Sequence, residues 1–266
     1  MKELDARIIS AGLERNGLFR EIHVEPSVDS TNTRLAEWVR EGRAGPGVLL
    51  AAEVQTAGRG RMGREWRSPP RSGLTFSFTL PDYFPGRPGL LTVGTALAAA
   101  EAIRRETRLS PSIKWPNDLC LGTGKLAGIL ARTVAGPSGP LVVMGVGINV
   151  NAAPSPSDSR HGLPPVCLRG FTGREVDRNR LLAAVLRETE GVCRRFARGE
   201  YGFVASGLRA RSLLVGRRAR FSFRGRVFSG IVRDHTEALA VVLETAAGTV
   251  ELPGEAAELL GFDFPR

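Results

Sequence analysis

The alternation of apolar and polar positions changes its period near residue 212. Before that point, apolar residues recur at helical spacing in some stretches and form strand-like runs in others. After it, short runs such as ARFSFRGRVF and TVELPG alternate with a period of two and are separated by turns. We therefore predict a mixed domain of helices and strands over residues 1–211 and a small β-barrel over residues 212–266.

The first part contains predicted helices. Leu35, Trp38 and Val39 share one helical face, and Asp29 and Ser30 can cap the helix start before them. This places the beginning of a helix at the sequence DSTN. The predicted helices span residues 31–41, about 90–107 and 177–198.

Apolar runs predict strands between these helices. The run GVLLAAEV leads directly into QTAGRGRMGREW, so this stretch rich in glycine and arginine connects strands and is not a tail. SIKWPNDLCL and KLAGILART, joined by the turn GTG, predict a hairpin. The Pro- and Ser-rich residues 152–165 predict a loop. The predicted strands and hairpin arms span residues 47–54, 74–80, 112–121, 125–133 and 141–150.

The composition limits the class of protein. With 266 residues and 42% hydrophobic content, the chain can bury a core without disulfides. Cys120, Cys167 and Cys193 are odd in number and far apart, which excludes a disulfide framework and a CxxC-type metal site. The N-terminus lacks a signal-peptide pattern, and no stretch approaches the ~20 apolar residues of a membrane span. We expect a soluble, cytoplasmic protein with no membrane association.

The charge favours an anionic partner without naming it. Lys and Arg number 37 against 27 Asp and Glu, for a formal charge of +10. Phe221, Phe223 and Phe228 lie among arginines, a pattern compatible with a non-enzymatic, basic nucleic-acid-binding protein. The same alternation is typical of a barrel strand with one face in the core. Salt-dependent binding to nucleic acid would separate these interpretations.

The stretch QTAGRGRMGREW combines backbone freedom with positive charge. Its glycines, at positions 58, 60 and 63, allow close approach of the backbone to a ligand. Arg59, Arg61 and Arg64 supply guanidinium groups suited to phosphate and carboxylate. The alternative interpretation is an exposed basic loop.

The hairpin carries two lysines, Lys114 and Lys125, that we expect to lie near each other. Lysines beside phosphates stabilise negative charge that grows during displacement, although lone lysines in hairpins are mostly solvated. Asn117 and Asp118 after Pro116 are compatible with simple turn residues. Asp118 is alternatively a metal-associated carboxylate.

Two further segments place small or polar residues at element ends. Gly145 and Gly147 in GVGIN alternate on one strand face, which weakens the strand unless another segment or a ligand lies against it. Asn149 then offers a donor and acceptors beside that face. Ser30 serves either as a helix cap only or, with its neighbours in DSTN, as part of a polar ligand site.

The order and spacing of these motifs resemble one family, the biotin protein ligases. DSTN, QTAGRGRMGREW, KWPND, GKLAGIL and GVGIN occur in the family's order, and the resemblance runs from about residue 29 to the C-terminus. It implies an α+β fold: a mixed, largely antiparallel sheet flanked by helices, similar to class II synthetases, with a C-terminal SH3-like barrel.

The resemblance also implies an activity. Such ligases activate biotin with MgATP to biotinyl-5′-AMP and transfer the biotinyl group to one lysine of the biotin carboxyl carrier protein of acetyl-CoA carboxylase or a related carboxylase. ATP and Mg²⁺ are the expected cofactors. The expected catalytic residues are Lys125, Arg59 and Arg61. The expected biotin-binding residues are Ser30, Thr31, Asn32, Gln55, Gly58, Arg59, Gly60, Arg61, Lys125 and Gly128. The expected ATP-binding residues are Arg61, Arg64, Trp66, Lys114, Asn117 and Asn149.

The sequence departs from bifunctional family members at its N-terminus. Residues 1–28 are too short a stretch for the winged-helix DNA-binding domain of such members, so we expect a monofunctional ligase that does not bind DNA. Whether it forms a homodimer is left open. The nearest enzymatic alternative is a lipoate or octanoyl ligase of related fold, and the KWPND segment together with GRGRMGR favours biotin.

Overall fold

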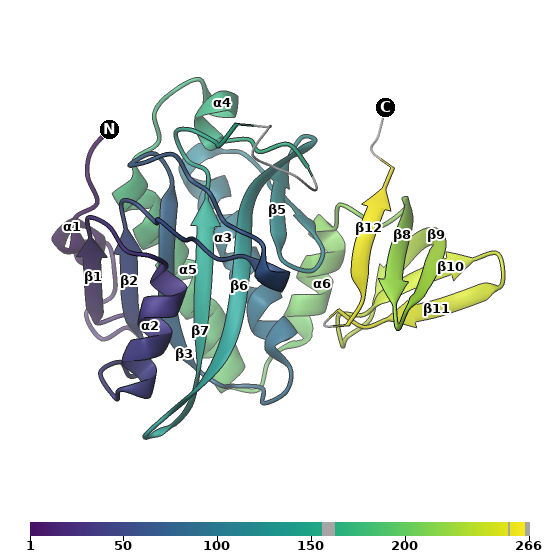
Figure 1. The fold of residues 1–266 in the computed structure, drawn as a ribbon, viewed down its shortest axis with the longest axis horizontal. Coiled ribbons are helices and arrows are strands. Elements are labelled where there is room, and N and C mark those ends of the chain that lie inside the picture. The colour runs from purple at the N-terminus through teal and green to yellow at the C-terminus, as the bar shows by residue number, and fades with distance from the viewer. Residues whose placement is uncertain (156–162, 255, 264–266) are drawn as a thin grey trace.

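The computed structural model describes residues 1–155, 163–254 and 256–263, and Figure 1 shows a larger part and a smaller part. A seven-stranded sheet with the order β1-β2-β3-β7-β6-β5-β4 forms the larger part. Only the β1–β2 pairing is parallel. The mixed, largely antiparallel sheet is therefore confirmed. Its strands are β1 (Glu21–Glu25), β2 (Val48–Ala52), β3 (Leu74–Pro81), β4 (Ser112–Lys114), β5 (Asp118–Leu121), β6 (Gly124–Gly136) and β7 (Gly139–Ile148).

Helices cover both faces of this sheet (Figure 1). Because side chains alternate along a strand, Val48 and Leu50 of β2 pack with α2, whereas Leu49 and Ala51 belong to the main core with α3 and α5. The three predicted helices are confirmed to within two residues. The helices are α1 (Ala6–Ala11), α2 (Thr31–Arg40), α3 (Pro88–Thr107), α4 (Leu168–Thr172), α5 (Arg178–Ala197) and α6 (Gly202–Arg211).

Several elements differ from the prediction. The arm predicted as one strand over 112–121 is two antiparallel strands, β4 and β5, because the chain turns at Pro116 and Asn117. The short edge strand β1 and the short helices α1, α4 and α6 were not predicted. The loop predicted over 152–165 lies partly outside the described residues.

The smaller part is a five-stranded antiparallel sheet with the order β11-β10-β9-β8-β12. It occupies the region where the barrel was predicted, and in the described part of the chain β11 and β12 are its outer strands. Trp115 of the larger part is 1% exposed; it lies against Phe221 and donates from Nε1 to the Leu239 carbonyl at 2.9 Å. One hydrophobic cluster thus joins both parts. The strands are β8 (Arg218–Phe223), β9 (Arg226–His235), β10 (Val241–Thr245), β11 (Gly248–Leu252) and β12 (Glu258–Phe262).

Among the helices of the described residues, none has the length and apolar character that a membrane span requires.

Candidate active site

The start of α2 lies next to the residues that follow the end of β2. Ser30 caps the helix, accepting from the Thr33 amide at 3.4 Å. The Thr31 amide and hydroxyl both donate to Gln55 Oε1, at 2.8 and 3.0 Å. The same hydroxyl lies 2.9 Å from that of Ser77 on β3. The predicted residues Ser30, Thr31 and Gln55 are therefore brought together in a polar, mostly buried cluster.

Asn32 lies beside the glycine face of β7. Its side chain is buried and donates to the Val143 carbonyl at 3.4 Å. A Cβ atom at Gly145 would lie 3.0 Å from Asn32 Nδ2, so the absence of a side chain there makes room for the amide. The Asn32 side chain therefore fills the space over Gly145 on the α2 face of the sheet, next to the Thr31 and Gln55 cluster.

The glycine- and arginine-rich stretch folds back on itself as a closed loop. The Gly60 amide donates to the Arg64 carbonyl at 2.7 Å, and the Trp66 amide donates to the Gly58 carbonyl at 3.0 Å. Positive φ angles at Met62 (55°) and Gly63 (72°) turn the chain at the tip. The loop therefore presents its arginines from a hydrogen-bonded base rather than from an extended tail.

Trp66 of this loop lies against Gly147 of β7. A Cβ at Gly147 would collide with the indole, and one at Gly128 on β6 would lie 3.3 Å from Cζ3. Lys125 Nζ is 5.7 Å from the ring centroid, within the range of a cation–π contact. In the described structure Trp66 Nε1 is buried without a hydrogen-bond partner. The expectation that a chain segment or ligand covers Gly145 and Gly147 is confirmed.

Asp118 lies between the two lysines of the β4-β5-β6 region. Its Oδ1 is 2.8 Å from Lys125 Nζ and its Oδ2 is 3.0 Å from Lys114 Nζ. Burial alone would raise the pKa of Asp118, but the two ammonium groups hold it below its ordinary value. The predicted proximity of Lys114 and Lys125 is confirmed, and neither is a freely solvated lysine.

The alternative role of Asp118, as a metal-associated carboxylate, stays a prediction, and the geometry bears on it. Both carboxylate oxygens already face ammonium groups, and two positive charges at contact distance disfavour a divalent cation at the same oxygens. Within residues 1–155, 163–254 and 256–263, no group of three or more His, Cys, Asp or Glu side chains could hold a metal ion.

Three of the remaining residues predicted to bind ATP lie in two places: Arg61 and Asn117 where the loop contacts the KWPND turn, and Asn149 at the end of β7. Arg61 donates to Asn117 Oδ1 at 3.3 Å, and Asn117 Nδ2 donates to the Ile129 carbonyl at 2.9 Å, so the loop contacts the KWPND turn. Asn149, at the end of β7, is 2% exposed, and its Oδ1 finds no partner in the described part of the protein. A buried, unpaired amide oxygen is suited to receive a ligand's N–H group.

Arg59 and Arg64 lie outside this set of contacts. Arg59 is exposed, and Arg64 forms an ion pair with Glu258 of the second sheet at 2.9 Å. Sequence reasoning missed Ser77 and Glu258. Ser77 carries little signal in the sequence, because it is one of three hydroxyl residues that alternate with apolar residues in LTFSFTL, and its full burial is a property of the fold. Glu258 carries none, since it is a partly exposed acid in an edge strand.

Comparison with known proteins identifies the family. Residues 24–149 match the Biotin/lipoate A/B protein ligase family. A biotin--[acetyl-CoA-carboxylase] ligase from Mycobacterium tuberculosis (strain ATCC 25618 / H37Rv) is 34% identical over 238 residues, which cover 87% of this chain and 86% of that protein. The chain belongs to the biotin protein ligase family.

Further relatives agree in fold and sequence. A biotin protein ligase from Aquifex aeolicus, solved in complex with biotin and ATP, matches this ligase with a TM-score of 0.81 and 28% identity, covering 91% of this chain and 99% of that one. The bifunctional ligase/repressor BirA of Bacillus subtilis (strain 168) is 32% identical over 159 residues, which cover 59% of this ligase and 49% of BirA. The motifs of the candidate site lie within residues 24–149, the stretch that matches the family.

Proposed function

We propose that this ligase activates biotin with MgATP to biotinyl-5′-AMP and then biotinylates a lysine of a carboxylase's carrier protein. One observation supports this more than any other. The closed loop places Trp66 over Gly147, beside two lysines that pair with buried Asp118 and beside two unpaired buried polar atoms, Trp66 Nε1 and Asn149 Oδ1. Such unpaired atoms are the donors and acceptors that a bound ligand would satisfy.

The chemistry needs positive charge more than a nucleophilic side chain. A biotin carboxylate oxygen attacks the α-phosphorus of ATP, the new P–O bond forms, and the bond to pyrophosphate breaks. Lys125 is one-third exposed and held at one side by Asp118, which leaves ammonium hydrogens free to face the carboxylate and the α-phosphate. We assign the same stabilising role to Arg61 and Arg59 of the loop.

The second step is aminolysis of the adenylate. The amine of the acceptor lysine attacks the acyl carbon, an amide forms, AMP leaves, and the amine loses a proton to solvent. Before the amine attacks, biotinyl-AMP, a reactive mixed anhydride, must be protected from water. The loop of residues 58–66, closed by its own hydrogen bonds, is the segment suited to cover it.

We assign the ligands to neighbouring parts of the site. Biotin is held by the α2 cluster of polar groups and by the loop, with Ser30, Thr31, Asn32, Gln55, Gly58, Gly60 and Gly128 as its neighbours. ATP is held by Arg61, Arg64, Trp66, Lys114, Asn117 and Asn149. Mg²⁺ enters with the nucleotide as MgATP, because the described residues offer no cluster of acidic ligands for it.

The division of labour between the two parts of the chain belongs to the same proposal. Residues 1–211 carry the biotin and ATP sites, and residues 212–266 assist ATP or the acceptor protein. The ion pair of Arg64 with Glu258 supports this, because it links the loop to β12. We also propose that the ligase acts in the cytoplasm, where its three free cysteines stay reduced, and that it does not bind DNA.

Biotin-dependent exchange of labelled pyrophosphate into ATP tests the proposed function. The purified protein should catalyse exchange with biotin and Mg²⁺, and not with lipoate or octanoate in its place. Exchange with lipoate or octanoate but not biotin would assign the protein to the related ligases, and no exchange with any acid would refute the proposal. Titration with mixed nucleic acid at low salt tests separately whether the ligase binds DNA.

A further inference from the structure

The loop that covers the site begins where β2 and β3 separate. Ala52 pairs with Thr75 at the last register position, and the Thr75 hydroxyl donates to the Ala52 carbonyl at 2.9 Å. Glu53 is the first residue beyond this pairing on one side, and Gly73 lies beyond it on the other. A side chain that binds both Glu53 and Gly73 therefore fixes both ends of the connection between β2 and β3, which contains the loop of residues 58–66.

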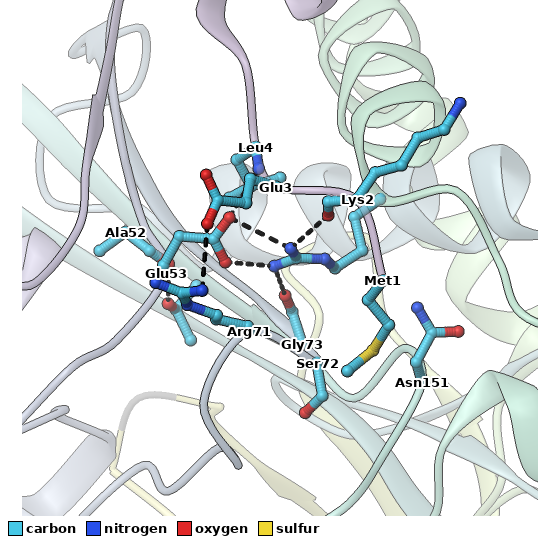
Figure 2. A network of polar contacts seen from close by, with 12 residues as sticks. Met1, Lys2, Glu3, Leu4, Ala52, Glu53, Arg71, Ser72, Gly73 and Asn151 are labelled. Atoms are coloured by element: carbon cyan, nitrogen blue, oxygen red, sulfur yellow. Dashed lines mark hydrogen bonds and ion pairs between the residues drawn. The ribbon is translucent and has the colours of Figure 1, made fainter.

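Arg178, the first residue of α5, is such a side chain. Its guanidinium donates to Glu53 Oε2 at 2.6 Å and Oε1 at 3.1 Å, and to the Gly73 carbonyl at 3.2 Å. The side chains of Arg178 and Glu53 are only 2% and 8% exposed. Figure 2 shows Glu53 and Gly73 close to each other beside the N-terminal segment. A bidentate, buried Arg–carboxylate pair has a fixed orientation, so it constrains the geometry of both loop ends.

The N-terminal segment, residues 2–4, completes the arrangement (Figure 2). Arg178 also donates to the Lys2 carbonyl at 2.7 Å, and the Leu4 amide donates to Glu53 Oε1 at 2.6 Å. The exposed side chains of Arg71 and Glu3 form an ion pair at 3.0 Å. The segment thus covers the Glu53–Arg178 pair and contacts the returning arm of the loop.

The returning arm of the loop, at Ser72, also contacts the segment after β7, near Asn149. The Asn151 amide donates to the Ser72 carbonyl at 2.8 Å, and the Asn151 side chain exchanges hydrogen bonds with the Val176 backbone at 2.9 and 3.0 Å. Asn151 is two residues beyond Asn149. The start of α5, the base of the loop and the end of β7 are therefore one hydrogen-bonded unit.

We propose that Glu53 and Arg178 are positioning residues for the adenylation step: as a hinge clamp, they set both ends of the loop so that its tip closes over the ligand. This rests on the proposed function. Buried ion pairs contribute little net stability compared with apolar residues of similar volume. The clamp therefore acts chiefly on the geometry of the loop, and the N-terminal segment shields the pair from water.

The test is the double variant Glu53→Leu/Arg178→Met, which removes the pair without leaving a buried charge unpaired. The control is Glu101→Leu/Arg211→Met, which removes the 3.3 Å ion pair between α3 and α6, together with the contacts of Glu101 to Arg104 and Arg105, away from the loop ends. We expect both doubles to fold, as judged by circular dichroism. The clamp variant should form biotinyl-AMP at least tenfold more slowly, with biotin affinity within about threefold of the parent. The control should keep the parental rate.

A second readout does not depend on activity. Trypsin should cleave at Arg59, Arg61 or Arg64 severalfold faster in the clamp variant than in the parent or the control. If the double variant fails to fold, Arg178→Lys replaces it, because an ammonium cannot hold Glu53 and the Gly73 carbonyl in the same fixed fork. A folded clamp variant with the parental adenylation rate and parental cleavage overturns the inference. A parent that forms no adenylate refutes the proposed function instead, and the trypsin comparison still decides the clamp.

Discussion

The indole of Trp66 occupies the space that a side chain at Gly147 would need. A Cβ built at position 147 would lie 2.6 Å from Cζ2 and nearer still to other ring atoms, which real contacts do not allow. The two residues come from segments far apart in the sequence, the arginine-rich loop and β7. The glycine is therefore a steric requirement of the closed loop and not only a feature of the strand.

Gly147→Ala should displace Trp66 and with it the loop. Because the loop lies at the surface and can shift outward, we expect a modest loss of stability, about 1–2 kcal/mol, in the range of overpacking. The rate of adenylate formation should fall about tenfold or more, since the closed conformation becomes strained. Single-turnover formation of biotinyl-AMP measures the rate. A red shift of the tryptophan emission, to which Trp38 and Trp115 contribute equally in parent and variant, reports greater exposure of Trp66.

Gly191→Ala is the matched control for that substitution. A Cβ at Gly191 in α5 meets no atom within 4 Å, so alanine there should leave activity unchanged and raise helix stability by up to about 1 kcal/mol. Parental activity in Gly147→Ala would show that Trp66 need not lie against β7 during the reaction.

Much of the fold was predictable because its signals are local. The helix cap at Ser30, the spacing of Leu35 and Val39, and the alternation after residue 212 are each set by neighbouring residues. The sequence was compatible with a turn after Pro116, but residues 112–121 were predicted as one hairpin arm because apolar residues on both sides of the turn continue the strand pattern. The edge strand β1 was missed because it is short and only Ile22 and Val24 pack against the core, which leaves a weak local signal.

The candidate site was only partly predictable, for a different reason. Motifs identified which residues matter, but their contacts depend on strand register. Asp118 pairs with Gly128 across β5 and β6 and with Lys114 across β4 and β5, and this places it between the two lysines. No local signal separates that arrangement from a metal-binding aspartate. Arg178 was likewise hidden, because only tertiary packing brings the start of α5 to the fork between β2 and β3.

Lys125→Ala and Lys114→Ala should differ in the rate of adenylate formation, although each removes one ammonium group that pairs with Asp118. Each leaves buried Asp118 with one ammonium partner, so we expect similar stability losses of about 1–3 kcal/mol. Lys125→Ala should lower the rate of adenylate formation roughly a hundredfold, the loss typical of one preorganised donor, while biotin affinity falls far less. Lys114→Ala should slow the same step less than tenfold.

Rapid-quench measurement of biotinyl-AMP and calorimetric titration of biotin separate the two effects. Lys114→Ala is the control, because it also removes a cation beside Asp118. Substitution of a lysine far from Asp118 would not control for that loss. Equal slowing in both variants would mean that the lysines act through Asp118 alone. A near-parental rate in Lys125→Ala would remove Lys125 from the catalytic residues.

The packing of the second sheet should weaken in acid through His235. This histidine is fully buried; its Nε2 lies 2.9 Å from the Ser212 hydroxyl, and Nδ1 has no partner among the described residues. Burial lowers the pKa of His235 to about 4, against an ordinary value of 6.5. Between these values the unfolded chain binds a proton that the folded chain excludes, so stability falls as the pH falls.

His235→Gln should remove this dependence while keeping a polar side chain near Ser212. Guanidinium unfolding of the parent should show a loss from His235 that begins below about pH 6.5, reaches about 2 kcal/mol at pH 5 and is complete near pH 4, at about 3 kcal/mol. The variant will be less stable than the parent at pH 7.5, because it loses packing, but its stability should change less on acidification. If His235→Gln and the parent lose the same free energy of unfolding between pH 7.5 and 5, His235 is not the group whose protonation weakens the fold.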